Sequence, residues 1–217
     1  MPKLERVEKY KGRTMQLTFE DGECDFLNAD IVQRYSLRAG ADIPAAAWEE
    51  IKHADTFRRA RERAMYLLDY RDYSYADMVK KLMNNYEEDI CFEVADDLAG
   101  RGFINDVRYA ETLARQKFEV KLLGEFRVKQ FLREKGIPAA VIEQALEPYR
   151  EDAAERAREL AERRYMKYFD PDDRDLMQKL KNALARQGYG YGEIKEAIAD
   201  MIEDYENEEL DEFEDRS

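Results

Sequence analysis

Apolar residues follow two different spacings along the chain. In the N-terminal segment "RTMQLTFEDGECDFLN", apolar and polar residues alternate on both sides of Asp21-Gly22. A period of two on either side of Asp-Gly is typical of a β-hairpin. A further strand is expected over about residues 4–10. The N-terminus is therefore predicted to form a small antiparallel sheet.

Short helices are predicted to follow this sheet. Asn28 is expected to cap a helix in "NADIVQRYSL", because its side chain can accept from a free N–H of the first turn. Ile43-Pro44 then opens another helix that passes through Ile51. We assign residues 1–53 to this N-terminal hairpin and its short helices.

The rest of the chain has helical spacing and contains one unit three times. Gly136 and Gly188 are 52 residues apart, and apolar residues stand at the same offsets before and after each glycine. Asn85 lies 51 residues before Gly136, with similar apolar positions around it. Asn, like Gly, tolerates the left-handed backbone that closes a helix. All three residues are therefore predicted to form the turn between two helices.

Each unit is expected to hold three helices. Ser74 and Asp77 have the spacing of a capping box at the start of a middle helix, and Pro171 is expected at the first position of another. The predicted fold class is mainly α, with three tandem three-helix repeats in an elongated array and the small N-terminal β-hairpin extension. The predicted repeats cover residues 54–104, 105–150 and 151–205, and residues 206–217 are predicted to be a disordered acidic tail.

Charge is unevenly distributed along the chain. The net charge is −13, and residues 203–217 contain nine acidic residues and one basic residue. Residues 101–135 contain nine Lys or Arg and five Asp or Glu, a net charge of +4. The overall acidity argues against indiscriminate binding to nucleic acid, but it leaves room for a local basic face.

Several classes of site and location are disfavoured. Cys24 and Cys91 are far apart and are expected to be two buried thiols in a reducing compartment. His53 is the only histidine, so neither a zinc site nor a His-based catalytic dyad is expected, and no cofactor is predicted. "GYGYG" follows a predicted helix rather than a strand, which favours a helix joint over a phosphate loop. No apolar run approaches the ~20 residues of a membrane span, and no signal peptide is recognised, so the cytoplasm is expected.

The basic residues of the second repeat are the candidates for binding. Between residues 127 and 135 only Glu134 is interspersed, so a contact with an acidic partner or phosphates is about as favoured as a solvated helix face. The fourteen tyrosines are consistent with positions at the edge of the core or, for a minority, with stacking on bases. The candidate residues for binding a partner or DNA are Arg108, Arg115, Lys117, Arg127, Lys129, Arg133 and Lys135.

The segment "GRGFINDVRYAETLARQKF", residues 100–118, resembles the RecX family of bacterial regulatory proteins. "FLREKGI" with the helix after it resembles the second unit of that family, and "LARQGYGYGEIKEAI" resembles the third. The similarity extends from about Phe57 to Tyr205. Asn85 stands where the family usually has Gly, and the acidic tail lies outside the family core.

This resemblance implies three copies of a three-helix module without enzymatic activity. It implies binding to the RecA recombinase, along the groove of its filament on single-stranded DNA. It also implies restraint of the ATPase, strand-exchange and co-protease activities, within DNA repair and the SOS response. The expected protein is a monomer that contacts DNA only indirectly or weakly and binds no membrane. An autonomous DNA-binding protein that uses helix–turn–helix joints is the alternative, and an enzyme is the least favoured class.

Overall fold

The computed structural model describes the backbone of residues 3–214 and the side chains of residues 3–207. Its internal contacts divide the chain into two units, which are described separately. The first contains the residues up to 73 together with 78–104, and the second contains 74–77 together with 105 onward. Helices dominate both units, and the only strands in the described part lie at the N-terminus, so the predicted mainly α class is confirmed.

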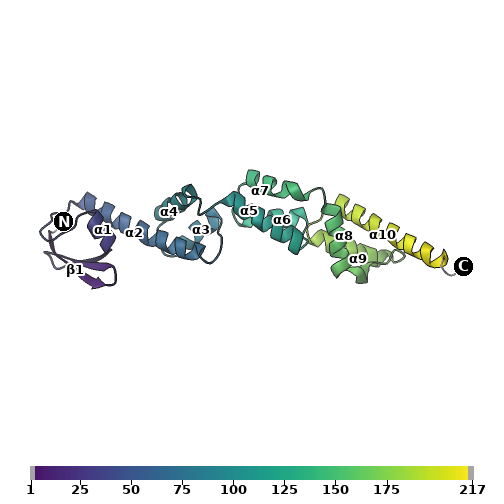
Figure 1. The fold of residues 1–217 in the computed structure, drawn as a ribbon, viewed down its shortest axis with the longest axis horizontal. Helices are drawn as coiled ribbons and strands as arrows, with labels where there is room; N and C mark the ends of the chain where they lie inside the picture. Colours follow the sequence, from purple (N-terminus) through teal and green to yellow (C-terminus); the bar gives the residue numbers. More distant parts are fainter. Residues whose placement is uncertain (1–2, 215–217) are drawn as a thin grey trace. The chain divides into compact units, whose positions relative to one another are not determined.

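The first unit begins with an antiparallel sheet (Figure 1). Strands β1 (Leu4–Lys11), β2 (Thr14–Phe19) and β3 (Cys24–Asn28) are arranged in that order. Leu17 and Leu27 are buried on the inner face, where they pack with Trp48. Cys24 pairs with Thr18 across the strands and is exposed. The prediction of two buried thiols is therefore wrong for Cys24, because on β3 the inward residue is Leu27; Cys91 is buried as expected.

Four helices follow the sheet: α1 (Ala29–Arg34), α2 (Ala45–Leu68), α3 (Tyr75–Leu82) and α4 (Glu88–Gly100). The Asn28 side chain accepts a hydrogen bond from the N–H of Asp30, as its predicted capping role requires. The predicted boundary between residues 53 and 54 lies inside α2, because no Gly or Pro interrupts residues 45–68. Within α2, buried Asp55 accepts from the N–H of Asn28, and this bond ties the helix to the sheet.

The turn at Asn85 differs from the prediction. Gly136 and Gly188 have φ values of +69° and +96°, whereas Asn85 is not among the described residues with positive φ. Its N–H bonds to the carbonyl of Leu82, 2.9 Å away, in an ordinary turn after α3. The left-handed conformation expected from the repeat is therefore present at two of the three turns.

The second unit contains α5 to α10 and three short helical turns. Their bounds are α5 (Asp106–Arg115), η1 (Gln116–Val120), α6 (Glu125–Glu134), α7 (Ala139–Leu146), η2 (Glu147–Tyr149), α8 (Ala153–Arg164), η3 (Met166–Tyr168), α9 (Arg174–Arg186) and α10 (Tyr191–Glu214). One apolar cluster is formed mainly by α5, α6 and α7, and another by α8, α9 and α10. The second repeat thus comprises α5–α7, and the third comprises α8–α10.

Two element ends in the third repeat need correction. The α9 helix begins at Arg174 with Asp173 as its cap, so Pro171 precedes the helix instead of occupying its first position. The α10 helix continues through Glu214, although disorder was predicted from residue 206. No Gly or Pro occurs after Gly192, so the sequence contains no helix-breaking residue near position 206. Residues 215–217 of the predicted tail lie outside the described residues.

The turn of the third repeat docks on the start of α6. Gly124 N–H donates to the carbonyl of Gln187 at 2.9 Å, and Phe126 N–H donates to that of Gly188 at 3.1 Å. These carbonyls satisfy N–H groups that have no partner within the helix itself. A Cβ on Gly124 would lie 2.2 Å from the carbonyl carbon of Gly188, so glycine is required for this approach. We call this contact the glycine joint.

The turn of the second repeat docks on the first residues of α3 in a corresponding way. Ser74 Oγ donates to the carbonyl of Lys135 at 2.7 Å and accepts from the N–H of Asp77, which confirms its predicted capping role. Lys135 Nζ lies 2.9 Å from a carboxylate oxygen of Asp77. The N–H of Tyr75 donates to Asp106 Oδ1 at 2.8 Å. We call this contact the polar joint, because side chains make most of its bonds.

Candidate functional site

Two of the predicted binding residues meet around one aromatic ring. Lys117 Nζ lies 4.5 Å from the centroid of the Phe131 ring, and the Arg127 guanidinium carbon lies 5.4 Å from it. Arg127 and Phe131 are four residues apart on α6, so they share a face of that helix. Both distances are within the ~6 Å range of cation–π attraction. We call Lys117, Arg127 and Phe131 the basic-aromatic surface.

A local irregularity of the backbone places Lys117 on this surface. Lys117 lies in η1, a single π-helical turn that follows α5 without a break. The next residue, Phe118, is buried and stacks on Tyr149 with ring centroids 4.5 Å apart. With Phe118 fixed in the core, Lys117 lies against the Phe131 ring. Single π-helical turns are frequent at functional sites.

The cations of α6 fall into two electrostatic groups. Lys129 forms an ion pair with Glu143 on α7, and Lys135 forms one with Asp77. Lys117 and Arg127 have no carboxylate partner among the side chains of residues 3–207. The hydrogen-bond acceptor of the Arg127 guanidinium among the described side chains is the neutral amide oxygen of Gln130, at 3.4 Å. The positive charge of the basic-aromatic surface is therefore available to a partner, whereas that of Lys129 and Lys135 is largely neutralised within the chain.

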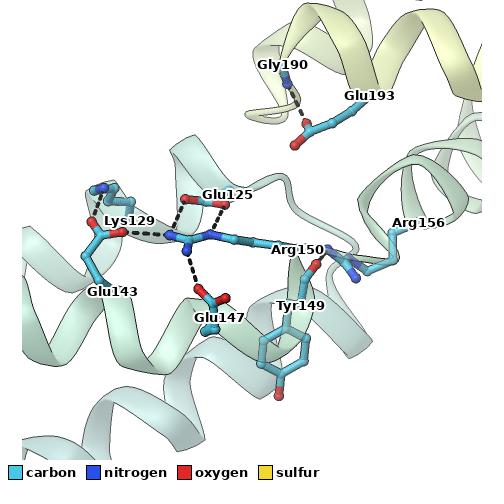
Figure 2. Close-up of polar contacts among 9 residues, drawn as sticks. All are labelled: Glu125, Lys129, Glu143, Glu147, Tyr149, Arg150, Arg156, Gly190 and Glu193. Carbon is cyan, nitrogen blue, oxygen red and sulfur yellow. Dashed lines mark hydrogen bonds and ion pairs between the residues drawn. The ribbon is translucent and has the colours of Figure 1, made fainter.

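An ion-pair network holds α6 against α7 (Figure 2). The Arg150 guanidinium contacts carboxylates of Glu125 on α6, Glu143 on α7 and Glu147 on η2. Hydrogen bonds from Lys129 and then from Arg150 lower the pKa of Glu143. Hydrogen bonds to Glu125 and Glu143 raise the pKa of Arg150, which keeps it charged. The network fixes the orientation of the helix that carries Arg127 and Phe131.

The remaining predicted residues do not join this surface. Arg108 is exposed on α5 and has an interaction of its own. Arg115 is exposed beside Tyr149, on an open cavity that Glu143 and Glu147 also line. Arg133 is exposed near the end of α6, without a carboxylate partner in the described part of the chain. The structure thus brings together Lys117 and Arg127 out of the seven candidates.

Two aromatic residues on α6 were missed in the sequence. Phe131 is half-buried under the two cations, and Phe126 is 69% exposed at the first turn of the helix. The spacing of Arg127 and Phe131 by four residues was the available signal, because such pairs are neighbours on a helix. Lys117 could not be placed from spacing, because η1 interrupts the regular helical period.

The described residues form neither a cluster of metal ligands nor a membrane-spanning helix. Within the described residues, no group of three or more His, Cys, Asp or Glu side chains is placed to hold a metal ion. The Nε2 atom of His53, the only histidine, lies 3.1 Å from the Oε2 atom of Glu93. None of the helices in the described part is long and apolar enough to cross a membrane.

Comparisons with known proteins give one consistent match. The family model "RecX, second three-helix domain" matches residues 105–146, and "RecX, third three-helix domain" matches residues 151–198. The chain is 28% identical over 212 residues to the regulatory protein RecX of Streptococcus sanguinis, covering 95% of this chain and 81% of that protein. It is 26% identical over 174 residues to the regulatory protein RecX of Clostridioides difficile, covering 80% of this chain and 82% of that protein.

Solved structures agree with these sequence matches. A crystal structure of a regulatory protein RecX has a TM-score of 0.73 at 25% identity, covering 92% of this chain and 100% of the other. The crystal structure of RecX from Lactobacillus salivarius has a TM-score of 0.63 at 28% identity, covering 68% of this chain and 97% of the other. Because two domain models match in the family's order, and sequence and fold agree along most of the length, this chain belongs to the RecX family of regulatory proteins.

Proposed function

We propose that this chain is a non-enzymatic regulator that binds the RecA recombinase on single-stranded DNA. Binding restrains the recombinase's ATPase, strand-exchange and co-protease activities in the cytoplasm. Membership of a family of regulatory proteins supports the regulatory role. The single structural observation that supports the binding mode is the pair of cations, Lys117 and Arg127, that face Phe131 without a carboxylate partner among the described side chains.

The excess of acidic residues in the chain makes it informative that these two cations have no carboxylate partner among the described side chains. The chain has 49 acidic and 36 basic residues, so an unpaired cation has many available neighbours of opposite sign. Two such cations around one ring form a surface that suits phosphates or the carboxylates of a partner protein. A recombinase filament on DNA offers both kinds of group. A protein bound across neighbouring filament subunits would oppose the rearrangement that ATP turnover requires.

Autonomous DNA binding through a helix–turn–helix joint is less well supported. Such a joint must leave its second helix free to enter the major groove. The turn at Gly188 is packed against the backbone of Arg127, and a Cβ on Gly136 would lie 2.4 Å from the Cβ of Ala76. Both turns are thus occupied by contacts within the chain, which favours a partner-dependent mode of binding.

Recombinase ATPase on single-stranded DNA, titrated with this protein, is the test. We expect ATP hydrolysis to fall with a saturable dependence on protein concentration. In a parallel mobility-shift assay, the DNA should be shifted strongly only when the recombinase is present. Unchanged hydrolysis at saturating protein would contradict the regulatory proposal, and a strong shift without recombinase would favour the autonomous DNA-binding alternative.

A further inference from the structure

Leu122 has a backbone conformation that leucine rarely adopts. Its φ of +51° lies in the left-handed region, and among the described residues other than glycine only Ser36 shares this sign. A bulky side chain at such a φ is rare, because its Cβ approaches the following carbonyl oxygen too closely. Strain of this kind persists only where the surrounding structure enforces it, and it is frequent at functional sites.

The strained residue closes the π-helical turn η1. The N–H of Leu122 donates to the carbonyl of Phe118 at 3.1 Å, and the N–H of Leu123 donates to that of Lys117 at 3.0 Å. This pair of bonds is the Schellman arrangement that ends many helices, in which the left-handed residue is usually glycine. Lys117 in turn lies against the ring of Phe131. The backbone of one cation of the basic-aromatic surface is therefore tied to Leu122.

Contacts from the third repeat explain why a leucine stands at this position. The Leu122 side chain is 4% exposed and packs in the apolar cluster of α8, α9 and α10. The next residue, Leu123, packs instead against the cluster of α5, α6 and α7. The left-handed turn thus directs two consecutive leucines into two different cores. Glycine would suit the backbone at position 122, but it would lose the contact with the third repeat.

Tyr189 adds a polar contact from the third repeat. Its hydroxyl donates to the carbonyl of Leu122 at 2.9 Å. Burial of Tyr189 raises its pKa above the usual value for tyrosine, so the hydroxyl stays protonated at neutral pH and can donate. Without this donor, the buried carbonyl would be destabilised and the strained backbone could relax toward negative φ. The third repeat therefore holds Leu122 by both its side chain and its carbonyl.

We infer that Leu122 and Tyr189 are positioning residues, through which the third repeat holds Lys117 against Phe131 for binding the recombinase. Both residues are buried, so they act on a partner only through Lys117. The use of this surface for binding rests on the proposed function, whereas the placement of Lys117 does not. The basic-aromatic surface of the second repeat is thus completed by contacts from the third.

Two substitutions at position 122 separate backbone strain from burial. Leu122→Ile keeps the apolar volume, but its branched Cβ resists positive φ, so it should release the turn and displace Lys117. Leu122→Met keeps the volume without branching and should behave like the parent. Tyr189→Phe should act like Leu122→Ile. Its control is Tyr165→Phe, which removes a hydroxyl packed against the same cluster but bonded to Gln187 instead.

Nuclear magnetic resonance of the full chain with isotopically labelled lysine measures the placement of Lys117. Because Lys117 lies over Phe131, the ring current should shift its ε-methylene signal upfield, and Phe131→Leu should identify that signal by abolishing the shift. The parent and the two controls should keep the shift, whereas Leu122→Ile and Tyr189→Phe should lose most of it. An unchanged shift in both variants would overturn the inference, whether or not the chain inhibits the recombinase.

Inhibition of recombinase ATPase on single-stranded DNA tests the role of this placement in binding. Leu122→Ile and Tyr189→Phe should need at least about threefold more protein for half-maximal inhibition than their controls, because one cation has left the surface. Unchanged inhibition by variants that have lost the shift would overturn the role of positioning in binding. A parent that does not inhibit would contradict the proposed function, and the resonance shift would still decide whether the third repeat positions Lys117.

Discussion

The glycine joint and the polar joint serve the same purpose with different chemistry. Each docks the turn of one repeat on the start of the preceding middle helix. At the glycine joint, carbonyls of Gln187 and Gly188 accept from N–H groups at the start of α6. At the polar joint, the side chains of Ser74 and Asp106 satisfy the corresponding N–H groups of α3. The close approach is between two backbone segments at the glycine joint, and between a backbone segment and a side chain at the polar joint.

This difference predicts where the chain tolerates change. Gly124 and Gly188 approach so closely that a Cβ on either would meet backbone atoms of the other joint segment. At the polar joint the corresponding Cβ on Gly136 would meet only the Ala76 side chain and its Cα. The glycine joint is therefore expected to be the less tolerant of substitution.

Gly188→Ala should have the largest effect on stability. The added Cβ would lie 2.5 Å from the backbone N of Arg127, and the residue would have to keep a φ of +96°. Overpacking and the left-handed backbone together should lower the free energy of unfolding by about 3 kcal/mol or more. Urea denaturation measures the change. Gly192→Ala is the control, because no atom lies within 4 Å of its Cβ position, and a stability loss as large in that variant would refute the steric explanation.

Tyr189→Phe should have an intermediate effect at the same joint. The substitution leaves the buried carbonyl of Leu122 without the hydroxyl that donates to it at 2.9 Å. Leaving a buried acceptor unsatisfied costs about 1–3 kcal/mol. Thermal denaturation compares this variant with Tyr191→Phe, whose hydroxyl belongs to an exposed side chain. Equal melting temperatures for the two variants would show that the buried bond does not stabilise the joint.

Lys135→Met should have the smallest effect, and it should depend on salt. The ion pair of Lys135 and Asp77 is partly exposed, with 34% and 20% of the two side chains accessible, so it contributes less than about 1 kcal/mol. Screening weakens such a pair, so the difference between parent and variant should shrink as salt increases. Urea denaturation at two salt concentrations measures it. A loss of stability as large as that of Gly188→Ala would show that the polar joint is as sensitive to substitution as the glycine joint.

The repeat and its caps were accessible from sequence because they depend on local spacing. Asn28 and Ser74 cap helices as predicted, since a cap needs only its own first turn. The conformation of Asn85 was not accessible, because positive φ at Gly136 and Gly188 accompanies docking on another repeat. The repeat period in the sequence therefore indicates a left-handed turn correctly only where that turn docks on another repeat.

The candidate site was predicted only in part, for a related reason. Lys129 and Lys135 looked equivalent to Arg127 along the helix, but their carboxylate partners lie 14 and 58 residues away in sequence. Pairing over such distances depends on how helices pack. The π-helical turn η1 places Lys117 in the basic-aromatic surface, and the regular helical period of the sequence does not reveal such a turn. Composition and spacing therefore identified the basic helix, whereas tertiary contacts determine which of its cations lack a carboxylate partner.

Inhibition of recombinase ATPase by surface variants tests whether the basic-aromatic surface binds the recombinase. Lys117→Glu with Arg127→Glu reverses both cations around Phe131, and Arg174→Glu with Lys179→Glu makes the same charge change on α9. If the basic-aromatic surface binds the recombinase on single-stranded DNA, the first variant should need at least about ten times more protein for half-maximal inhibition, equivalent to about 1.4 kcal/mol. The control should inhibit like the parent. Equal inhibition by the parent and both variants would show that Lys117 and Arg127 do not bind the recombinase.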